Sequence, residues 1–442
     1  MKGHIGTTIG TVFLAAMAGQ RADAAGFAIK EQSATALGNA FAGATSMAED
    51  PSYMFFNPAA VGRLDGHQAA IAGTRISPTA QVTDAEASNP GNAVAAPIGG
   101  TDSFEDVGPD APVPALYGTF ELAPAWRLGL GVNAPFALET RYDDDWVGRY
   151  HGVKSRVLAI NVNPVVAYNP IPRVSLAAGL QLQYIEADLS NAVDFATVTG
   201  AAPAGTLDGF ADIEGDDTGL GFTLGLLAEP VDGTRLGIAY RSSIDHTLDG
   251  DADFTVPAAV AGAAPAVAAA FADTGATAGI ELPAMVNLGI AQDLGEQVTV
   301  MAEAQWTQWS KFDRLVIDFD SALPDNVTEE EWDDQWFLAL GATWRPAPEL
   351  ALRVGVAYDQ KPLQAKFRTP RIPDNDRYWV SAGLSWTPHP AVAVTAGYTR
   401  IFIEDAEVRL RVDGIGNATR GNLDARYDAD IDLMAVGAVI RF

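Results

Sequence analysis

Residues that could carry out catalysis are few in this sequence, and they form no recognisable constellation. The five histidines stand far apart, at positions 4, 67, 151, 246 and 389. No Gly-x-Ser-x-Gly or His-Glu-x-x-His motif occurs. The absence of cysteine excludes thiolate nucleophiles and thiolate metal ligands. The sequence therefore predicts a protein that is not an enzyme and that requires no cofactor.

Two acidic runs offer carboxylates that could bind a cation. Asp143-Asp144-Asp145 and the run from Asp249 to Asp253 do not follow the EF-hand spacing. We therefore interpret both runs as solvated loop charge and expect no metal site. The whole chain has 56 acidic and 28 basic residues. This balance argues against nucleic acid as a partner, because phosphate binding requires clustered Lys and Arg.

The chain is predicted to consist mainly of β-strands. Apolar residues make up 48% of the 442 residues, yet the mean hydropathy is only +0.06, so polar and apolar residues are finely interleaved. Period-two alternation recurs in segments 174–184, 298–307 and 350–359. One face of each segment suits lipid and the other suits a polar lumen. A soluble β-sandwich would alternate as well.

The spacing of turns distinguishes these two architectures. Short connections occur at 123–124, 169–172, 230–233, 346–349 and 388–390, and Gly295 marks a further one. Long polar stretches stand between them, at 78–112, 137–153, 190–213, 246–277, 321–333, 361–376 and 410–426. Tight turns on one side and long loops on the other are typical of an outer-membrane barrel.

We predict an all-β fold, a transmembrane antiparallel barrel of about fourteen strands. An even number returns both ends of the chain to the periplasm. The strands are expected near 67–77, 113–123, 126–136, 154–169, 173–189, 214–229, 234–245, 278–292, 296–320, 334–345, 350–360, 377–387, 391–409 and 427–442. The last strand ends on Phe442, and a terminal Phe resembles the signal that the barrel-assembly machinery reads. We expect a monomer surrounded by outer-membrane lipid and lipopolysaccharide.

The N-terminus has the features of a secretory signal peptide. Lys2 and His4 precede an apolar stretch from Ile5 to Ala18, and Ala22-Asp23-Ala24 offers small residues for cleavage after Ala24. The apolar stretch is too short for a membrane anchor, which needs about 20 residues. We therefore divide the chain into a signal peptide (1–24), a segment that precedes the barrel (25–66) and the barrel itself (67–442).

Segment 25–66 does not alternate, and we expect it to fill the lumen as a plug. It contains a helix candidate from Ser33 to Ala42, in which Leu37 and Phe41 would share a face. A barrel of about fourteen strands leaves room for a segment of this size.

An ordered set of motifs resembles the FadL family of outer-membrane transporters over nearly the whole mature chain. The first matches lie in the plug: Ala25-Gly26-Phe27, Glu31-Gln32-Ser33, the run 38–43 and Asn57-Pro58-Ala59. Later matches are Trp146-Val147-Gly148-Arg149-Tyr150, Asn163-Pro164 with Ala167-Tyr168, and the run from Ile372 to Gly383. The resemblance implies passive uptake of hydrophobic small molecules, above all long-chain fatty acids, by loop capture, an internal binding site and lateral exit through the wall. It implies no nucleotide and no metal.

Pro135 is our candidate for the lateral exit. Proline cannot donate to a β-ladder, so the third strand should be kinked or bulged there, and an unpaired backbone group in lipid is costly. The alternative is an ordinary bulge near a barrel rim. Asn57, Pro58 and Ala59 are expected to brace the plug against the wall, the alternative being a simple turn before the first strand.

Apolar and cationic residues complete the predicted ligand path. Phe27, Leu37, Phe41 and Phe55 are candidate gating contacts for a ligand tail, although residues of a plug core would look the same. A fatty-acid carboxylate in the channel needs a cationic partner. Our candidates are Arg156 and Arg353, placed on the lumen face; each could instead pair with a lumen acid such as Glu303.

The loop from Val256 to Phe271 is rich in Ala although it should face water. Exposed apolar surface often marks an interaction site, so this loop and the loop 190–213 are predicted to capture incoming lipid. A helix packed onto its own loop is the competing interpretation. Three functional alternatives remain from sequence: an aromatic-hydrocarbon channel of the same family, a general diffusion porin, and an outer-membrane lipase or adhesin.

Overall fold

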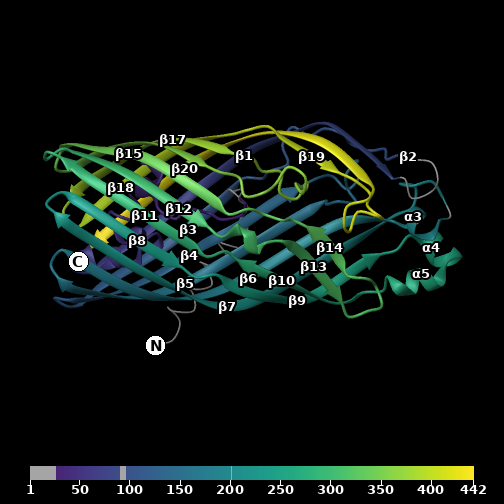
Figure 1. Ribbon diagram of the computed structural model, residues 1–442, viewed down its shortest axis with the longest axis horizontal. Coiled ribbons are helices and arrows are strands. Elements are labelled where there is room, and N and C mark those ends of the chain that lie inside the picture. The colour runs from purple at the N-terminus through teal and green to yellow at the C-terminus, as the bar shows by residue number, and fades with distance from the viewer. Residues whose placement is uncertain (1–25, 90–95, 201) are drawn as a thin grey trace, which may run out of the picture.

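The chain folds into one closed antiparallel β-barrel (Figure 1). The computed structural model describes residues 26–89, 96–200 and 202–442, so the predicted signal peptide lies outside them. Pairing of the first strand with the last closes the sheet, in a register that runs from Gln68 opposite Arg441 to Ser88 opposite Asn422. The predicted barrel of fourteen strands is confirmed.

Nine of the fourteen wall strands in the described chain are single elements, and five consist of two elements in line. The single ones are β1 (Gln68–Asn89), β3 (Ala111–Ala123), β4 (Trp126–Arg141), β5 (Lys154–Ile171), β6 (Val174–Asp194), β7 (Asp208–Val231), β16 (Leu350–Asp359), β17 (Arg377–His389) and β20 (Asn422–Arg441). The divided ones are β8 (Thr234–Arg241) with β9 (Ile244–Thr255), β10 (Thr274–Leu282) with β11 (Met285–Leu294), β12 (Val298–Thr307) with β13 (Arg314–Phe319), β14 (Asn326–Glu329) with β15 (Gln335–Ala347), and β18 (Val392–Ile403) with β19 (Ala406–Leu410). A short β2 (Ala96–Pro97) pairs with β1.

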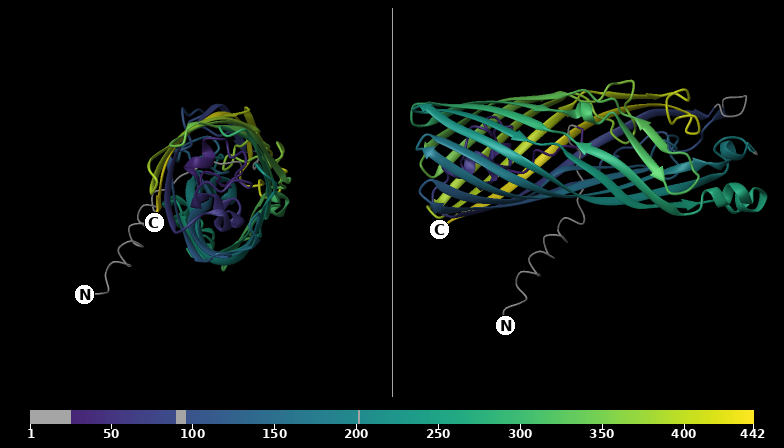
Figure 2. Two further views of the ribbon diagram at one scale, coloured as in Figure 1. Left: turned by 90° about the vertical axis from the view of Figure 1, so that its left-hand side faces the viewer. Right: turned by 60° about the horizontal axis from the view of Figure 1, so that its bottom comes forward.

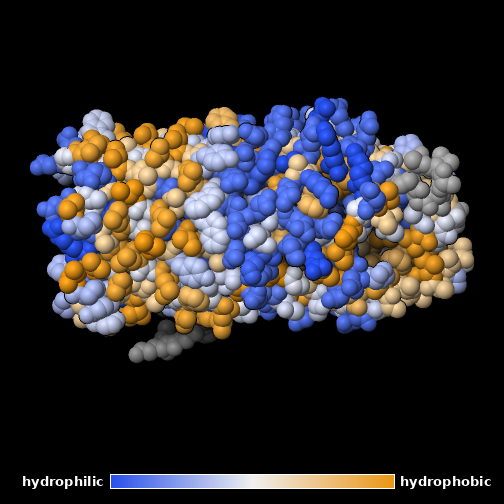
Figure 3. Space-filling model, viewed as in Figure 1, coloured by the Kyte–Doolittle hydropathy of each residue, from blue (hydrophilic) through white to orange (hydrophobic). Residues whose placement is uncertain are grey.

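An apolar belt encircles the end of the barrel that carries the tight turns (Figure 3). Exposed Trp residues border it, as Trp336 and Trp344 show on β15. Trp336 and Trp344 stand eight positions apart, which corresponds to roughly 26 Å along the strand. Because barrel strands are tilted, the height between the two along the barrel axis is smaller, about that of the hydrocarbon band. Among the described residues, no helix is long and apolar enough to cross a membrane.

The wall continues far beyond this belt on the side of the long loops. β1 has 22 residues and β7 has 24, whereas a strand crosses a bilayer with about 10. The six predicted tight turns are confirmed, but six of the seven predicted loops contain strand residues, most of all 78–112, 190–213 and 246–277. Outside the membrane the outer face of a strand contacts water and carries polar residues, such as Thr79, Gln81 and Thr83 of β1, while Ala80 and Val82 between them are buried. These polar residues make the strand ends resemble loops in the sequence.

Residues 26–66, here called the lumen segment, lie inside the barrel (Figure 2, left). They form three short helices: α2 (Ala34–Leu37), η1 (Pro51–Phe55) and η2 (Pro58–Arg63). The predicted helix from Ser33 to Ala42 is therefore wrong beyond Leu37. Ala40 and Phe41 have φ of 51° and 61°, a left-handed conformation that ends a helix.

Close approach of backbones explains how the lumen segment fits. A Cβ atom added to Gly237 of β8 would lie 1.9 Å from the carbonyl oxygen of Thr45, and one added to Gly355 of β16 would lie 2.1 Å from that of Asn39. Only glycine permits such contacts between a wall strand and a plug backbone. The wall therefore presses directly on the lumen segment at these points.

Gly237→Ala should displace the lumen segment and open an ion leak. One added methyl group has no space against the Thr45 carbonyl, and overpacking of this kind costs about 1–3 kcal/mol. Conductance in planar bilayers should rise above that of the wild type. Gly73→Ala is the matched control, because a Cβ on Gly73 meets nothing within 4 Å; equal conductance of the two variants would contradict the proposed contact.

Candidate functional site

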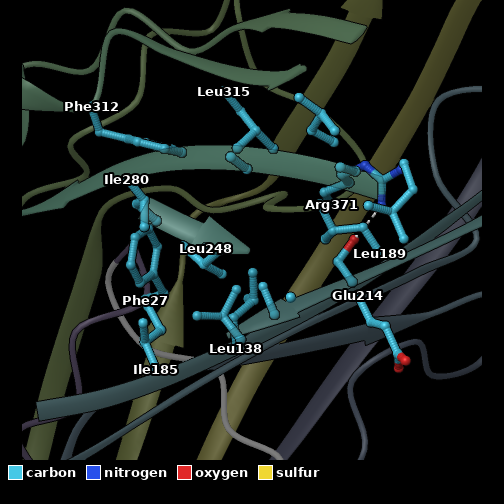
Figure 4. Close-up of a pocket in the computed structure, with 18 of the residues that line it drawn as sticks. Phe27, Leu138, Ile185, Leu189, Glu214, Leu248, Ile280, Phe312, Leu315 and Arg371 are labelled. Atoms are coloured by element: carbon cyan, nitrogen blue, oxygen red, sulfur yellow. Dashed lines mark hydrogen bonds between the residues drawn. The ribbon is translucent and has the colours of Figure 1, made fainter. Parts of the chain in front are cut away.

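An elongated cavity, here called the apolar cavity, lies inside the part of the barrel on the side of the long loops (Figure 4). Including its open mouth it contains about 830 Å³ of space not filled by atoms. Its walls come from β4 to β7, β9, β10 and β13, with the loop 360–376 above it. The apolar side chains that line it are Phe27, Leu138, Val157, Ile185, Ala187, Leu189, Ile213, Leu248, Ala276, Ala278, Ile280, Phe312, Leu315, Ile317 and Ile372.

Arg371 lies at one end of the apolar cavity, whereas Phe27 and Phe312 lie at the other (Figure 4). Its guanidinium donates hydrogen bonds only to neutral oxygens, among them the Lys154 carbonyl and the Ser155 hydroxyl, both at 2.8 Å. Within the described residues it forms no ion pair with a carboxylate. Burial, followed by the nearby charge of Arg420, lowers the pKa of Arg371 to about 9, so it remains charged at neutral pH.

Glu330 is the second polar group of interest in this cavity. It lies in the link between β14 and β15, outside the apolar belt, and accepts a hydrogen bond from Trp332 Nε1 at 3.0 Å. Burial raises the pKa of Glu330 to about 8, although Trp332, Arg371 and Arg420 all oppose the shift. The carboxyl is therefore mostly protonated at neutral pH and can donate a hydrogen bond to an anion.

An aromatic cluster closes the lower end of the apolar cavity. The ring centroid of Phe27 lies 4.7 Å from that of Trp309, 5.8 Å from that of Phe312 and 5.9 Å from that of Trp332. Gly26, the preceding residue, donates its backbone N–H to Asp374 Oδ2 at 3.0 Å. The loop 360–376 thus holds the start of the lumen segment in place.

A second space, here called the inner cavity, lies directly beyond Phe27. Its lining includes Ala28, Ile29 and Lys30 of the lumen segment and Pro135 of β4. Phe27 lines one cavity and its neighbour Ala28 lines the other, so the start of the lumen segment lies between the two.

The barrel wall is interrupted next to Pro135. Pairing between β3 and β4 stops at Leu116 opposite Val132, so residues 133–141 of β4 lack a partner from β3. We call this opening the wall gap. The pairing of β4 with β5 is also irregular there, with a register shift between Asn133 and Phe136.

The lumen segment covers the free edge of β4 in the wall gap. Ile29 donates its N–H to the Pro135 carbonyl at 2.8 Å, and Ala137 donates to the Phe27 carbonyl at 3.0 Å. The Gln32 amide bonds both backbone groups of Ala134, at 2.7 and 3.3 Å. A short piece of the lumen segment thus takes the place that β3 would hold in an unbroken wall.

The other predicted residues of the lumen segment lie at different depths. Phe41 and Phe55 line the inner cavity, whereas Leu37 is fully buried against the wall beside Gly397 and lines neither cavity. The Asn57 amide donates to the carbonyls of Thr45, at 2.7 Å, and Leu226, at 3.1 Å.

Asn57, Pro58 and Ala59 start η2 where it meets the wall. The Asn57 Oδ1 caps the helix by accepting from the Ala59 N–H at 3.0 Å. All three residues are buried next to Gly225 of β7, since a Cβ on that glycine would contact each of them. This geometry suits the predicted bracing of the plug against the wall.

The two arginines expected to bind a carboxylate do not line the apolar cavity. Ser155 and Val157 line it, and alternate residues of a strand face opposite sides. Arg156 therefore faces away, contrary to the expectation, and pairs with Glu186 at 2.6 Å. Arg353 lies on the lumen side of β16, but its guanidinium pairs with Glu49 of the lumen segment at 2.6 Å. The arginine that lines the apolar cavity is Arg371.

Arg371 and Asp374 are the residues that sequence reasoning missed. A signal was present, because Asp374 belongs to the family-like motif from Ile372 to Gly383 and Arg371 directly precedes it. The motif itself does not reveal that its loop crosses the barrel mouth. That position depends on hydrogen bonds to β5 and β6 and on the Tyr142 hydroxyl, which donates to the Pro370 carbonyl at 2.6 Å.

The loops expected to capture lipid carry three short helices: α3 (Phe195–Thr199), α4 (Ala258–Ala263) and α5 (Pro265–Ala270). Apolar surface gathers over α4 and α5 at the far end of the barrel (Figure 3). Phe271 closes the loop by packing on Phe195 and Phe254, with ring centroids at 4.9 and 5.5 Å. The loop thus carries helices, as the competing interpretation expected, and most of their alanines stay exposed. Capture of lipid by this surface stays a prediction.

In the part of the chain that the structure describes, no group of three or more His, Cys, Asp or Glu side chains is arranged to hold a metal ion.

Comparison with known proteins matches residues 15–442 to a family model described as outer membrane protein transport protein (OMPP1/FadL/TodX). The chain is 25% identical to the long-chain fatty acid transport protein of Escherichia coli over 411 residues, which cover 89% of this chain and 87% of that one.

Solved structures show the same architecture. A Pseudomonas aeruginosa FadL homologue superposes with a TM-score of 0.86 and 24% identity, covering 95% of this chain and 100% of that one. The Ralstonia pickettii toluene transporter TbuX superposes with a TM-score of 0.64 and 17% identity, covering 93% and 99%.

Phe27→Ala should join the apolar and inner cavities into one longer space. The ring that separates them would be gone, so the optimum in a series of alkyl sulfonates should shift to longer chains. Tryptophan fluorescence of the purified barrel can follow their binding, because Trp309 and Trp332 surround Phe27. Leu37→Ala is the control, since Leu37 lines neither cavity; an unshifted optimum in Phe27→Ala would contradict the assignment.

Proposed function

Since the chain belongs to the OMPP1/FadL/TodX family of outer membrane transport proteins, we propose that the hydrophobic compound it carries is a long-chain fatty acid. Membership of this family makes the protein a channel for hydrophobic compounds in the bacterial outer membrane, and not an enzyme. The relatives differ in the substrate that their names give, fatty acids in one case and toluene in another. The choice between these classes must therefore come from the site.

The observation that favours a fatty acid is the one cation, Arg371, at the end of a cavity lined mainly by apolar side chains. Residues 185–189 of β6 follow the length of the cavity, which corresponds to roughly 13 Å of strand. Such a space suits an extended alkyl chain better than one aromatic ring. A carboxylate at Arg371 would give this buried guanidinium the counter-ion that it lacks among the described residues.

The arrangement of the cavities supports a path in four steps. Apolar loop surface over α4 and α5 collects the molecule, and the apolar cavity binds it with the carboxylate towards Arg371. Displacement of Phe27 then gives access to the inner cavity. From there the wall gap beside Pro135 leads sideways out of the barrel.

Lateral exit through the wall gap requires that the lumen segment release β4. The hydrogen bonds to release in the wall gap are few, since Ile29, Ala137 and the Gln32 amide form them. β3 and β5 need not separate from their partners elsewhere. The bracing contacts of Asn57 lie far along the segment, so its first residues can move while the remainder stays seated on the wall.

The other sequence-based alternatives have less support from the site. Five aromatic rings, Phe27 among them, surround the lower end of the apolar cavity, and this feature would also suit an aromatic hydrocarbon. A diffusion porin needs a water-filled lumen, whereas the lumen segment fills this one with buried residues.

Assembly of the barrel is proposed to depend on Phe442. Its ring is 69% exposed at the edge of the belt, and its backbone exchanges hydrogen bonds with His67 at the first strand. The aromatic terminus is thus accessible to the barrel-assembly machinery at the seam between β1 and β20. We also propose a monomer in the membrane.

Competition for a fluorescent long-chain fatty acid on the purified barrel tests the proposed substrate. Oleate should displace the probe and toluene should not. Arg371→Met should weaken oleate binding by roughly 10-fold to 100-fold, the value of a hydrogen bond to a charged group, and leave hexadecane binding unchanged. Displacement by toluene alone would move the protein to the aromatic-hydrocarbon class.

Arg156→Met is the matched control for this variant. It removes the same charge from a residue that faces away from the apolar cavity and pairs with Glu186. Oleate affinity should stay at the wild-type value. A loss equal to that of Arg371→Met would contradict the assignment of Arg371 as the carboxylate partner.

The proposed site also predicts a pH dependence that originates at Glu330. Below a pKa of about 8 its neutral carboxyl can donate to the ligand head group, and above it the carboxylate repels an anion. Hexadecane sulfonate, whose head group does not titrate, should therefore bind about tenfold more weakly at pH 8.5 than at pH 6.5. Glu330→Gln should abolish this dependence; an unchanged pH profile in the variant would contradict the role of Glu330.

A further inference from the structure

A third cavity lies above Arg371, between the loops 360–376 and 411–421 and the strand β14. It contains about 730 Å³ of space not filled by atoms, including its open mouth. Its lining is His151, Thr328, Glu329, Lys366, Phe367, Thr369, Arg371, Arg409, Leu410, Arg411, Asp413, Gly414, Ile415, Asn417 and Arg420. The capture surface over α4 and α5 contributes none of these residues.

The charge of this lining is opposite to that of the chain. Lys and Arg supply five of its side chains and Asp and Glu only two, whereas the whole chain has twice as many acidic as basic residues. Two of the five cations are neutralised, because Arg409 pairs with Glu407 at 2.5 Å and Arg411 with Asp424 at 2.8 Å. The other three, Lys366, Arg371 and Arg420, have no ion pair within the described residues.

Arg420 is held in the cavity by neutral groups. Its guanidinium donates to the Thr328 hydroxyl at 3.1 Å and to the Asn326 side-chain oxygen, both on β14. Burial lowers the pKa of Arg420 to about 10, and the charge of Arg420 in turn helps to lower the pKa of Arg371. Arg371 and Arg420 thus line the same cavity, and neither forms an ion pair with a carboxylate among the described residues.

Glu330 is the acidic group that acts on both arginines, since its charge raises the pKa of each. Burial raises the pKa of Glu330 to about 8, so that its carboxyl is mostly neutral. Burial lowers the pKa of His151 to about 3, so that its ring is neutral too. A buried pair of like charges is costly, and an anion bound between the two arginines would remove that cost.

The cavity also has an apolar side that suits an amphiphile. Phe367, Leu410 and Ile415 line it, and Ile415 on the outer loop is 57% exposed. Arg371 belongs to the linings of both this cavity and the apolar cavity. A carboxylate could therefore move from Arg420 to Arg371 and stay close to a cation throughout.

We propose that this cavity is an anion-binding vestibule, which receives the carboxylate of an acidic amphiphile from water and delivers it to Arg371. The inference rests on the proposed fatty-acid function and adds a polar entrance to it. Arg420 and Lys366 attract the head group, while the tail lies against Phe367, Leu410 and Ile415. A neutral hydrocarbon gains nothing from this entrance and would use the loop surface over α4 and α5.

Stopped-flow association of a fluorescent fatty acid with the purified full barrel, at several salt concentrations, tests the vestibule. Arg420→Gln should lower the association rate constant about tenfold and flatten its salt dependence, as loss of electrostatic steering does. Arg420→Lys should retain most of the rate. Association of the corresponding fatty alcohol, which carries no charge, should be the same in all variants.

Two controls separate charge from structure. Asn326→Ala removes a contact of Arg420 but keeps its charge, and Arg426→Gln removes an exposed cation that does not line the vestibule; both should associate at the wild-type rate. A wild-type rate in Arg420→Gln, or an equal loss in Asn326→Ala, would overturn the vestibule while the fatty-acid function stands. Failure of the wild type to bind the fatty acid would overturn both.

Discussion

Backbone hydrogen bonding inside lipid is the constraint on which the rest of this structure depends. An amide or carbonyl without a partner in hydrocarbon costs several kcal/mol, so the sheet must close on itself, and β1 pairs with β20 along most of its length. At the wall gap, where β3 leaves β4, the lumen segment supplies partners for Ala134, Pro135 and Ala137. Because the lumen segment, and not a wall strand, supplies these hydrogen-bond partners, the wall can open at the wall gap without unfolding.

The lumen segment is held in two different ways along its length. From Asn39 to Ala59 its backbone presses on glycines of the wall, and the side chains of Glu49 and Asn57 bond to Arg353 and to the Leu226 carbonyl. Its first residues are held mainly by hydrogen bonds, from Gly26 to Asp374, from Thr74 to Glu31 and along the edge of β4, and by the packing of Phe27 in the aromatic cluster.

Charge and apolar surface are separated along the axis of the barrel. Apolar side chains form the belt and most of the lining of the apolar cavity, while Arg371, Arg420 and Lys366 gather at the mouth. In an acidic chain this placement creates a local positive field facing water, where steering of an anion is effective. Farther in, the cations Lys30 and Arg241 both line the inner cavity.

The sequence by itself determined the architecture of the wall. Alternation in segments such as 350–359, tight turns at Pro-containing sites and the even number of strands follow from the two-residue period of a strand and from the need for a closed sheet in lipid. Pro135 was identifiable too, because a residue without an N–H must interrupt a ladder. Strand ends above the membrane could not be predicted, since polar residues on their water-facing side make them resemble loops.

The tertiary structure alone decided which arginine lines the apolar cavity. Arg156, Arg353 and Arg371 carry the same guanidinium group. Their partners differ, since Glu186 and Glu49 neutralise the first two and only neutral oxygens contact the third. Those partners come from distant parts of the chain. Barrel closure and the path of the loop 360–376 across the mouth set these distances, and neither is encoded in local spacing.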